Sequence, residues 1–263
     1  MKKLIVIADW VDDSLRCQEL RTIVEGYVNN PSHPTISFMA SSHSSIHAGF
    51  LANQIALIEE RFGRPLETVI LLDIPSDNTE LFIARLKTGL YIVGPNSGNV
   101  FSFIKSSAEE IFHYQDIEKE NRFRKRDIYY RVVAHLLESL QDDLDLDEIH
   151  TNLIPELDFF VIGHIDNYGN IKTSIPEAIL QEKHHYGDIL EVSINGISKS
   201  VKYSSSLSEN EDGDIVMYPG SAGALQDYYM DIAVYTDFTS VSSTTAVREF
   251  DRPSPGTIIE LKI

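Results

Sequence analysis

The spacing of apolar residues changes along the chain, and the change marks two kinds of structure. Up to about residue 140, short apolar runs alternate with longer segments whose apolar residues recur every three to four positions. The runs predict buried strands, and the longer segments predict helices that cover them. The expected strands are Leu4–Ile7, Thr35–Met39, Val69–Leu72, Ile83–Leu86 and Leu90–Val93, and the expected helices are Ser14–Tyr27, Ile46–Phe62 and Asp127–Leu140.

Beyond residue 155 the pattern consists of short β runs, with Asn195-Gly196 as a strong hairpin turn between two of them. These runs are Phe159–Ile165, Ile189–Ile194, Lys199–Tyr203, Ile215–Tyr218, Tyr229–Val234 and Thr257–Ile263. The acidic segment 141–148 is interpreted as a connector. The sequence therefore predicts an α/β domain with a central, mostly parallel sheet over residues 1–154. A smaller all-β, barrel-like domain is expected over residues 155–263.

Composition narrows the classes of partner. The formal net charge of −18 repels nucleic acid and anionic membrane surfaces, so neither is expected as a partner. The basic residues at 122–126 lie among acidic ones and are interpreted as a solvated helix start. No apolar run approaches the ~20 residues of a membrane span. Cys17 is the single cysteine, so no internal disulfide is possible and a cytoplasmic location is expected.

The densest group of polar side chains lies between two apolar runs, at residues 166–170. Asp166 can accept hydrogen bonds, Asn170 can donate and accept them, Tyr168 offers a flat ring, and Gly169 permits close approach of the backbone. These groups could hold a purine nucleoside. Asn and Gly are also leading turn formers, so this segment alone favours an ordinary β-turn.

Five short motifs, in order along nearly the whole chain, resemble the S-adenosyl-L-methionine hydroxide adenosyltransferase family. This superfamily includes the fluorinating and chlorinating adenosyl enzymes. Residues 165–175 resemble the motif Asp-Arg-Phe-Gly-Asn-x-x-Thr-Asn-Ile, which opens the family's C-terminal domain. The other four segments are Ile5–Val11, Gly89–Gly98, Phe123–Ile128 with the following Val133–Leu136, and Tyr218–Gly223.

The resemblance implies a small-molecule adenosyl ligand, S-adenosyl-L-methionine or adenosine, and no further cofactor. It implies that Asp9 holds the ribose hydroxyls, that Asp166 lies near the amino-acid end of the ligand and that Asn170 binds the adenine edge. Tyr168 replaces the family's Phe in the same motif, and Ser221 matches the serine of the family's C-terminal turn. The family's ligand lies between neighbouring subunits of a trimer, so a homotrimer is expected. The simpler alternatives are a helix cap for Asp9 and a plain turn serine for Ser221.

The chain departs from the family at the residues that activate water, an Asp, an Arg and a His. Asp73 matches the Asp and is the expected catalytic residue, but Glu80 stands in the arginine position and Arg124 in the histidine position. These two substitutions, at the arginine and histidine positions, would disturb a shared proton network. Three alternatives stay open: slow hydrolysis of S-adenosyl-L-methionine to adenosine and methionine, binding without catalysis, or a scaffold reused for another ligand.

Two histidines lie close together in the sequence, at positions 43 and 47. His43 falls where the family has Asp-x-Thr-His, although Ala40 occupies the Asp position, and His43 is interpreted as a hydrogen-bonded structural residue. His43 and His47 have the i, i+4 spacing of metal ligands on a helix, but the sequence offers no third ligand. No metal is expected.

Overall fold

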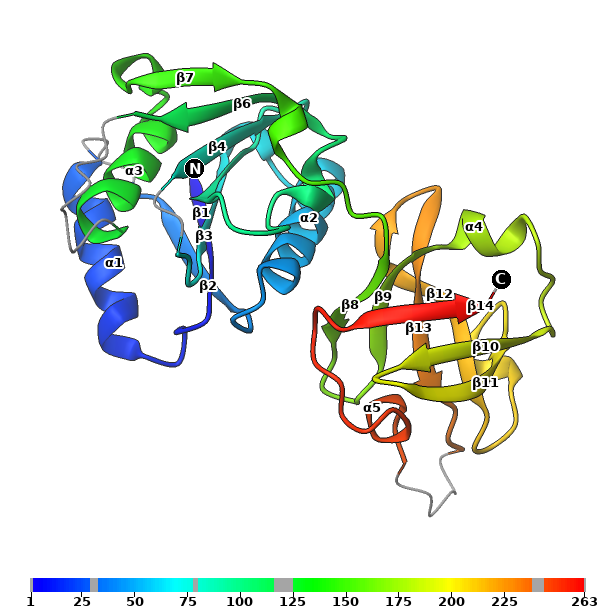
Figure 1. Cartoon of the computed structure of the whole chain (residues 1–263). Helices are drawn as coiled ribbons and strands as arrows, with labels where there is room; N and C mark the ends of the chain where they lie inside the picture. Colours follow the sequence, from blue (N-terminus) through cyan, green and yellow to red (C-terminus); the bar gives the residue numbers. More distant parts are fainter. Residues whose placement is uncertain (1, 29–32, 78–79, 116–124, 238–243, 263) are drawn as a thin grey trace. The chain divides into compact units, whose positions relative to one another are not determined.

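The computed structural model describes residues 2–28, 33–77, 80–115, 125–237 and 244–262. The chain divides into two compact units, Met1–Glu156 and Leu157–Ile263 (Figure 1). None of the helices in these described ranges combines the length and apolar character that a bilayer crossing requires.

The N-terminal unit is built on a mixed sheet with the order β2-β1-β3-β5-β4-β6-β7 across the described residues. Strands β2, β1, β3 and β5 run parallel, and β4, β6 and β7 extend the sheet by antiparallel pairing. Their bounds are β1 Lys3–Ala8, β2 Thr35–Ala40, β3 Thr68–Asp73, β4 Leu81–Leu86, β5 Tyr91–Pro95, β6 Ala108–Tyr114 and β7 Leu146–Ile149.

Helices cover both faces of this sheet (Figure 1). Helices α1 (Ser14–Tyr27) and α3 (Tyr130–Glu138) pack on one face, and α2 (Ser45–Phe62) packs on the other. A π-helical turn, Lys125–Tyr129, leads into α3. Short 3-10 turns occupy Pro65–Glu67, Ser102–Ile104, Gln141–Asp143 and Thr151–Leu153. The expected helices are confirmed to within a few residues at each end.

The interpretation of residues 141–148 as a connector is wrong. This segment contains a 3-10 turn and then β7, whose residues pair with β6 from Tyr114↔Leu146 to Ile111↔Ile149. Strand β7 lies at the sheet edge, and its two acidic residues, Asp147 and Glu148, are exposed. Acidic side chains are tolerated there because they discourage pairing with another chain, and they hide the apolar alternation by which strands are recognised.

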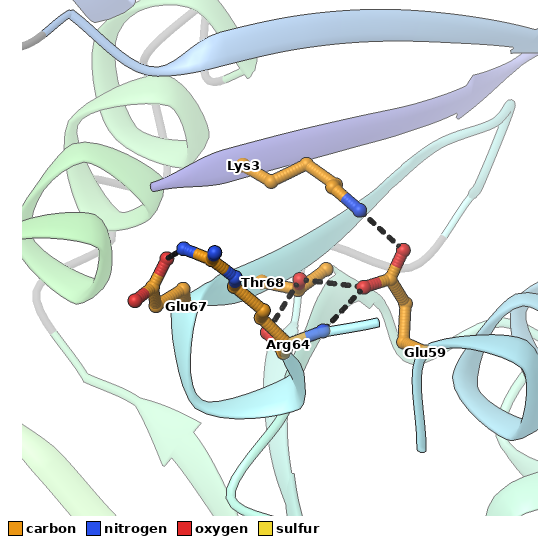
Figure 2. A network of polar contacts seen from close by, with 5 residues as sticks. All are labelled: Lys3, Glu59, Arg64, Glu67 and Thr68. Carbon is orange, nitrogen blue, oxygen red and sulfur yellow. Dashed lines mark hydrogen bonds and ion pairs between the residues drawn. The ribbon is translucent and has the colours of Figure 1, made fainter. Parts of the chain in front are cut away.

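A buried carboxylate ties the amino ends of β1 and β3 to the end of α2 (Figure 2). Glu59 is 6% exposed; Lys3 Nζ lies 2.6 Å from its Oε1, and the Thr68 hydroxyl and the Arg64 backbone N–H donate to its Oε2. Burial by itself would raise the pKa of Glu59, but these donors together hold it below its usual range. A Cβ at Gly63 would collide with the Glu59 carboxylate, so glycine permits this closure.

The C-terminal unit is a closed barrel with the order β10-β11-β12-β13-β9-β8-β14. Its strands are β8 Phe160–Ile165, β9 Ile171–Pro176, β10 Ile189–Ile194, β11 Ile197–Tyr203, β12 Ile215–Ala224, β13 Asp227–Val234 and β14 Ile258–Lys262, with a 3-10 turn Leu207–Glu209 and short helices α4 Glu177–Gln181 and α5 Ala246–Glu249. Both central residues of the predicted Asn195-Gly196 turn have positive φ, 53° and 74°, as this hairpin requires. The predicted fold class, a helix-covered sheet followed by a barrel, is confirmed.

Candidate functional site

In the N-terminal unit, the candidate residues gather at the carboxyl ends of the parallel strands. Asp9 follows β1 directly, and the last residue of β3, Asp73, lies opposite Ala8 in the strand register. The chain leaving β2 turns beside them, since the Ser41 N–H donates to the Ala8 carbonyl at 2.8 Å. Such strand ends are the usual binding edge of a parallel sheet.

Asp9 is not the helix cap that was its simpler alternative. The N-cap of α1 is Asp13, whose side chain accepts from the backbone N–H groups of Leu15 and Arg16. Asp9 Oδ2 instead lies 2.7 Å from His43 Nδ1, and the Asp9 side chain is 13% exposed. The imidazole orients the carboxylate. Because a carboxylate can accept about four hydrogen bonds, Asp9 keeps acceptor capacity for a ligand.

His43 and His47 have separate structural roles. The His43 side chain is 82% exposed and pairs with Asp9, whereas His47 is buried and its Nδ1 accepts from the Ser42 backbone N–H at 2.9 Å. Among the residues that the structure describes, no group of three His, Cys, Asp or Glu side chains could hold a metal ion.

Asp73, the expected catalytic carboxylate, is fully buried. Its Oδ2 accepts from the Tyr130 hydroxyl at 2.9 Å, and Tyr130 is the first residue of α3. Burial and the neighbouring charge of Asp73 raise the pKa of Tyr130 far above its usual value, so this phenol stays protonated. In the described structure, a protonated tyrosine therefore occupies one side of the carboxylate that was expected to orient water.

Glu80, which stands in the family's arginine position, holds the turn after β5. Its Oε2 accepts from Asn96 Nδ2 at 2.9 Å, and its backbone carbonyl accepts from the Asn96 N–H at 3.0 Å. This contact anchors the Pro95–Gly98 turn. Arg124, which stands in the family's histidine position, lies outside the described residues, as does Arg122 of the basic cluster at 122–126.

In the C-terminal unit, Asp166 organises the hairpin between β8 and β9. Its Oδ1 accepts from the backbone N–H groups of Tyr168 and Asn170, both at 2.9 Å, and its Oδ2 accepts from Asn170 Nδ2 at 3.0 Å. Gly169 has a φ of +80°, which its lack of a Cβ permits. The turn predicted from composition is present, and it fixes the two candidate ligand residues Asp166 and Asn170 against each other.

Tyr168 and Ser221 differ in their surroundings. Tyr168 projects from this hairpin with 81% of its surface exposed, so its ring is available for stacking. Ser221 lies in β12, where the register with β13 shifts between Pro219 and Gly223. Its hydroxyl accepts from Lys172 Nζ at 3.2 Å, so Ser221 does more than fill a turn.

The strand registers place four polar residues in one row across the barrel wall. His164 lies opposite Lys172, Lys172 opposite Asp231, and Asp231 opposite Tyr218. Lys172 Nζ lies 2.9 Å from Asp231 Oδ2 and also donates to Ser221. The row thus connects β8, β9, β13 and β12 and ends beside the C-terminal turn.

Burial shifts the pKa values of three residues in this row, Asp231, Tyr218 and His164. Asp231 is 4% exposed, and burial raises its pKa although Lys172 opposes the shift. Burial, with the charges of Asp231 and Asp166, raises the pKa of Tyr218 to about 12. Burial and then Lys172 lower the pKa of His164, which favours a neutral imidazole at pH 7.

The residues predicted from the sequence did not include Lys172, Asp231, His164 or Tyr218. The sequence did hold one indication of this row, because Asp231 is a carboxylate between the apolar residues Met230 and Ile232 of β13. A charge in such a position is buried only if it has a partner. The partner lies 59 residues away in the sequence, and only the strand register identifies it.

These features define a two-unit protein with polar clusters at a parallel-sheet edge and on a barrel wall. Residues 161–237 match the model of the SAM hydroxide adenosyltransferase C-terminal domain, and this range contains the Asp166 turn, Ser221 and the polar row. The predicted resemblance to this superfamily is thereby confirmed for the C-terminal unit, in which the match lies.

The comparison of structures supports the fold of the whole chain. An uncharacterized conserved protein from Thermotoga maritima is similar with a TM-score of 0.75 and 20% identity, covering 98% of this chain and 100% of that one. A conserved hypothetical protein from Thermus thermophilus has a TM-score of 0.68 and 17% identity, with full coverage of both chains. No curated protein matches the sequence significantly.

Proposed function

We propose that this protein binds an adenosyl ligand, adenosine or S-adenosyl-L-methionine. The observation that carries the proposal is the Asp166–Asn170 hairpin, because it lies inside the matched domain and its amide is held in one orientation. Asn170 uses Nδ2 to donate to Asp166, so Oδ1 is the acceptor it offers to a ligand. The exocyclic amino group of adenine is a matching donor.

The sheet edge of the N-terminal unit supports recognition of the ribose. Asp9 is oriented by His43, and its two oxygens suit two adjacent hydroxyl groups. As in the family that the sequence resembles, we expect the two groups of ligand residues to meet across subunits of a homotrimer. Light scattering should then give three times the 29.7 kDa mass of one chain. A monomer at micromolar concentration would contradict this.

Catalysis is proposed to be slow or absent. Hydrolysis needs a water aligned with the bond between C5′ and sulfur and a group that accepts its proton. Asp73 is buried against Tyr130, and Glu80 in the arginine position holds Asn96. Chromatography after incubation with S-adenosyl-L-methionine should therefore show no adenosine beyond one equivalent of protein. Multiple turnovers would contradict this part of the proposal.

Binding can be tested by calorimetry with adenosine and 2′-deoxyadenosine. Asp9→Asn keeps the size of the side chain and removes its charge, so it should weaken adenosine binding about tenfold, as for loss of a charged hydrogen bond. Asp12→Asn is the matched control, since Asp12 is an exposed carboxylate nearby in the same loop. Wild type should bind 2′-deoxyadenosine more weakly than adenosine.

Two outcomes would contradict the proposal. Equal affinity of the wild type and the Asp9→Asn variant for adenosine would show that the Asp9 carboxylate does not bind the ligand. Absence of binding by either adenosine or S-adenosyl-L-methionine would favour the alternative in which the scaffold takes another small ligand. Mass spectrometry of the protein as isolated would then identify that ligand.

A further inference from the structure

A cavity of about 480 Å³ lies in the N-terminal unit, and neither Asp9 nor Asp73 lines it. It is formed by residues of β4, β5, β6 and β7 and by the segment after α3. Tyr91, at the amino end of β5, lines it, whereas Asp9 and Asp73 lie at the opposite, carboxyl edge of the parallel strands. Its volume falls within the ~300–1,000 Å³ range of small-molecule pockets.

The cavity has an apolar floor. Tyr91, Phe112, Leu144 and Leu146 line it, and all four are partly buried side chains packed against the core between the sheet and helices α1 and α3. Helix α3 ends at Glu138, and the segment that follows, with the 3-10 turn Gln141–Asp143, supplies Gln141, Asp142 and Leu144 to the cavity lining. Aromatic and aliphatic surface is accessible from the cavity.

The polar side of the cavity carries excess negative charge. Arg85 is held by two carboxylates, with Nη1 2.9 Å from Glu109 Oε2 and Nε 2.7 Å from Glu110 Oε2. Of these groups, Arg85 and Glu110 line the cavity; Asp142 adds a second carboxylate to the lining, which leaves it with a net negative charge. Burial raises the pKa of Tyr91, so its hydroxyl is a neutral donor and acceptor among these charges.

We propose that this cavity binds an organic ammonium ion, a protonated amine carried on an apolar body. The carboxylates attract the cation, and the rings of Tyr91 and Phe112 stabilise it further because the face of an aromatic ring is negative. The apolar body covers the floor and is removed from water. The chain's net charge of −18 also favours a cation over an anion. The proposal is independent of the adenosyl ligand.

The test uses three probes of one shape, 2-phenylethylammonium, 2-phenylethanol and 2-phenylethanesulfonate, added to the full chain. Backbone amide NMR shifts should respond to the ammonium probe at residues 85, 91, 110, 112 and 141–146. Asp142→Asn should weaken its binding about fivefold, the size expected for one nearby charge facing solvent. Asp143→Asn is the matched control, because Asp143 is exposed in the same 3-10 turn but does not line the cavity.

Each alternative result would overturn the proposal. Shifts spread over the acidic surface, or equal effects of Asp142→Asn and Asp143→Asn, would mean diffuse attraction without a site. Equal binding of 2-phenylethanol would show that charge is not recognised. Preferential binding of the sulfonate would show that Arg85 dominates the cavity. No shift with the ammonium probe at millimolar concentration would mean that the cavity is not an amine site.

Discussion

The buried carboxylate of Glu59 should be a main support of the N-terminal unit, and Glu59→Gln tests this without changing side-chain size. Glu59 accepts from Lys3, from the Arg64 backbone N–H and from the Thr68 hydroxyl (Figure 2). An amide presents one acceptor oxygen where the carboxylate presents two. Its NH2 group must then face either the Lys3 ammonium or the Arg64 N–H, and both are donors.

The expected loss follows from which donors can find another partner. Lys3 has a side chain that is 36% exposed and returns to water, and Thr68 can donate to the Arg64 carbonyl at 2.9 Å instead. Two interactions are lost for the most part: the charge-assisted hydrogen bond from Lys3, and the hydrogen bond of one donor that is left facing the new NH2 group. Together they should lower the free energy of unfolding by about 2–3 kcal/mol.

The single tryptophan provides the assay. Trp10 is 8% exposed and lies in the N-terminal unit, so its fluorescence in urea reports the unfolding of this unit in the full chain. At ~2 kcal/mol per molar urea, the midpoint of Glu59→Gln should fall by about 1 M or slightly more. Glu60→Gln is the control, since Glu60 is the exposed neighbour in α2, and its midpoint should stay near that of the wild type.

The pH dependence distinguishes a charge effect from a packing effect. The pKa of Glu59 in the folded unit lies below its ordinary value of 4.5, so its contribution is complete above that value and is lost as pH falls through the folded-state pKa. The difference between wild type and Glu59→Gln should therefore be large at pH 7 and shrink below about pH 4.5. A constant difference across this range, or equal midpoints for the Glu59 and Glu60 variants, would refute the reasoning.

Two further predictions concern buried polar pairs. Lys172→Met leaves Asp231 buried without its cation, which should destabilise the barrel by about 3–5 kcal/mol at pH 7 in calorimetric unfolding. The control, Lys183→Met, changes an exposed position and should have little effect. Because burial already raises the pKa of Asp231, the Lys172→Met loss should diminish as pH falls and the carboxyl protonates; a pH-independent loss would contradict this. Tyr130→Phe removes the hydrogen bond to Asp73 and should lower the stability of the N-terminal unit by about 1–3 kcal/mol in the Trp10 assay, while the partly exposed Tyr27→Phe serves as control. Equal midpoints for these two variants would show that the Tyr130–Asp73 contact contributes nothing.

Much of the fold could be predicted because local sequence determines local structure strongly. Helices α1 and α2 begin at cap residues Asp13 and Ser44, and their apolar residues recur at helical spacing, so the sequence pattern revealed them. The Asn195-Gly196 turn was predictable because few residue pairs accept two positive φ values. Strand β7 was missed because its acidic sequence, Leu146–Ile149, lacks the alternation of a half-buried strand.

The sequence by itself determined the two kinds of unit, the resemblance to an adenosyltransferase superfamily and the residues at strand ends and turns. The tertiary structure decided which polar residues meet: His43 with Asp9, Tyr130 with Asp73, Glu80 with Asn96, and Lys172 with Asp231. Backbone preferences act over a few residues, whereas a buried charge needs a partner that strand pairing can bring from any distance along the chain. The partners that define both candidate sites therefore become visible only in the folded chain.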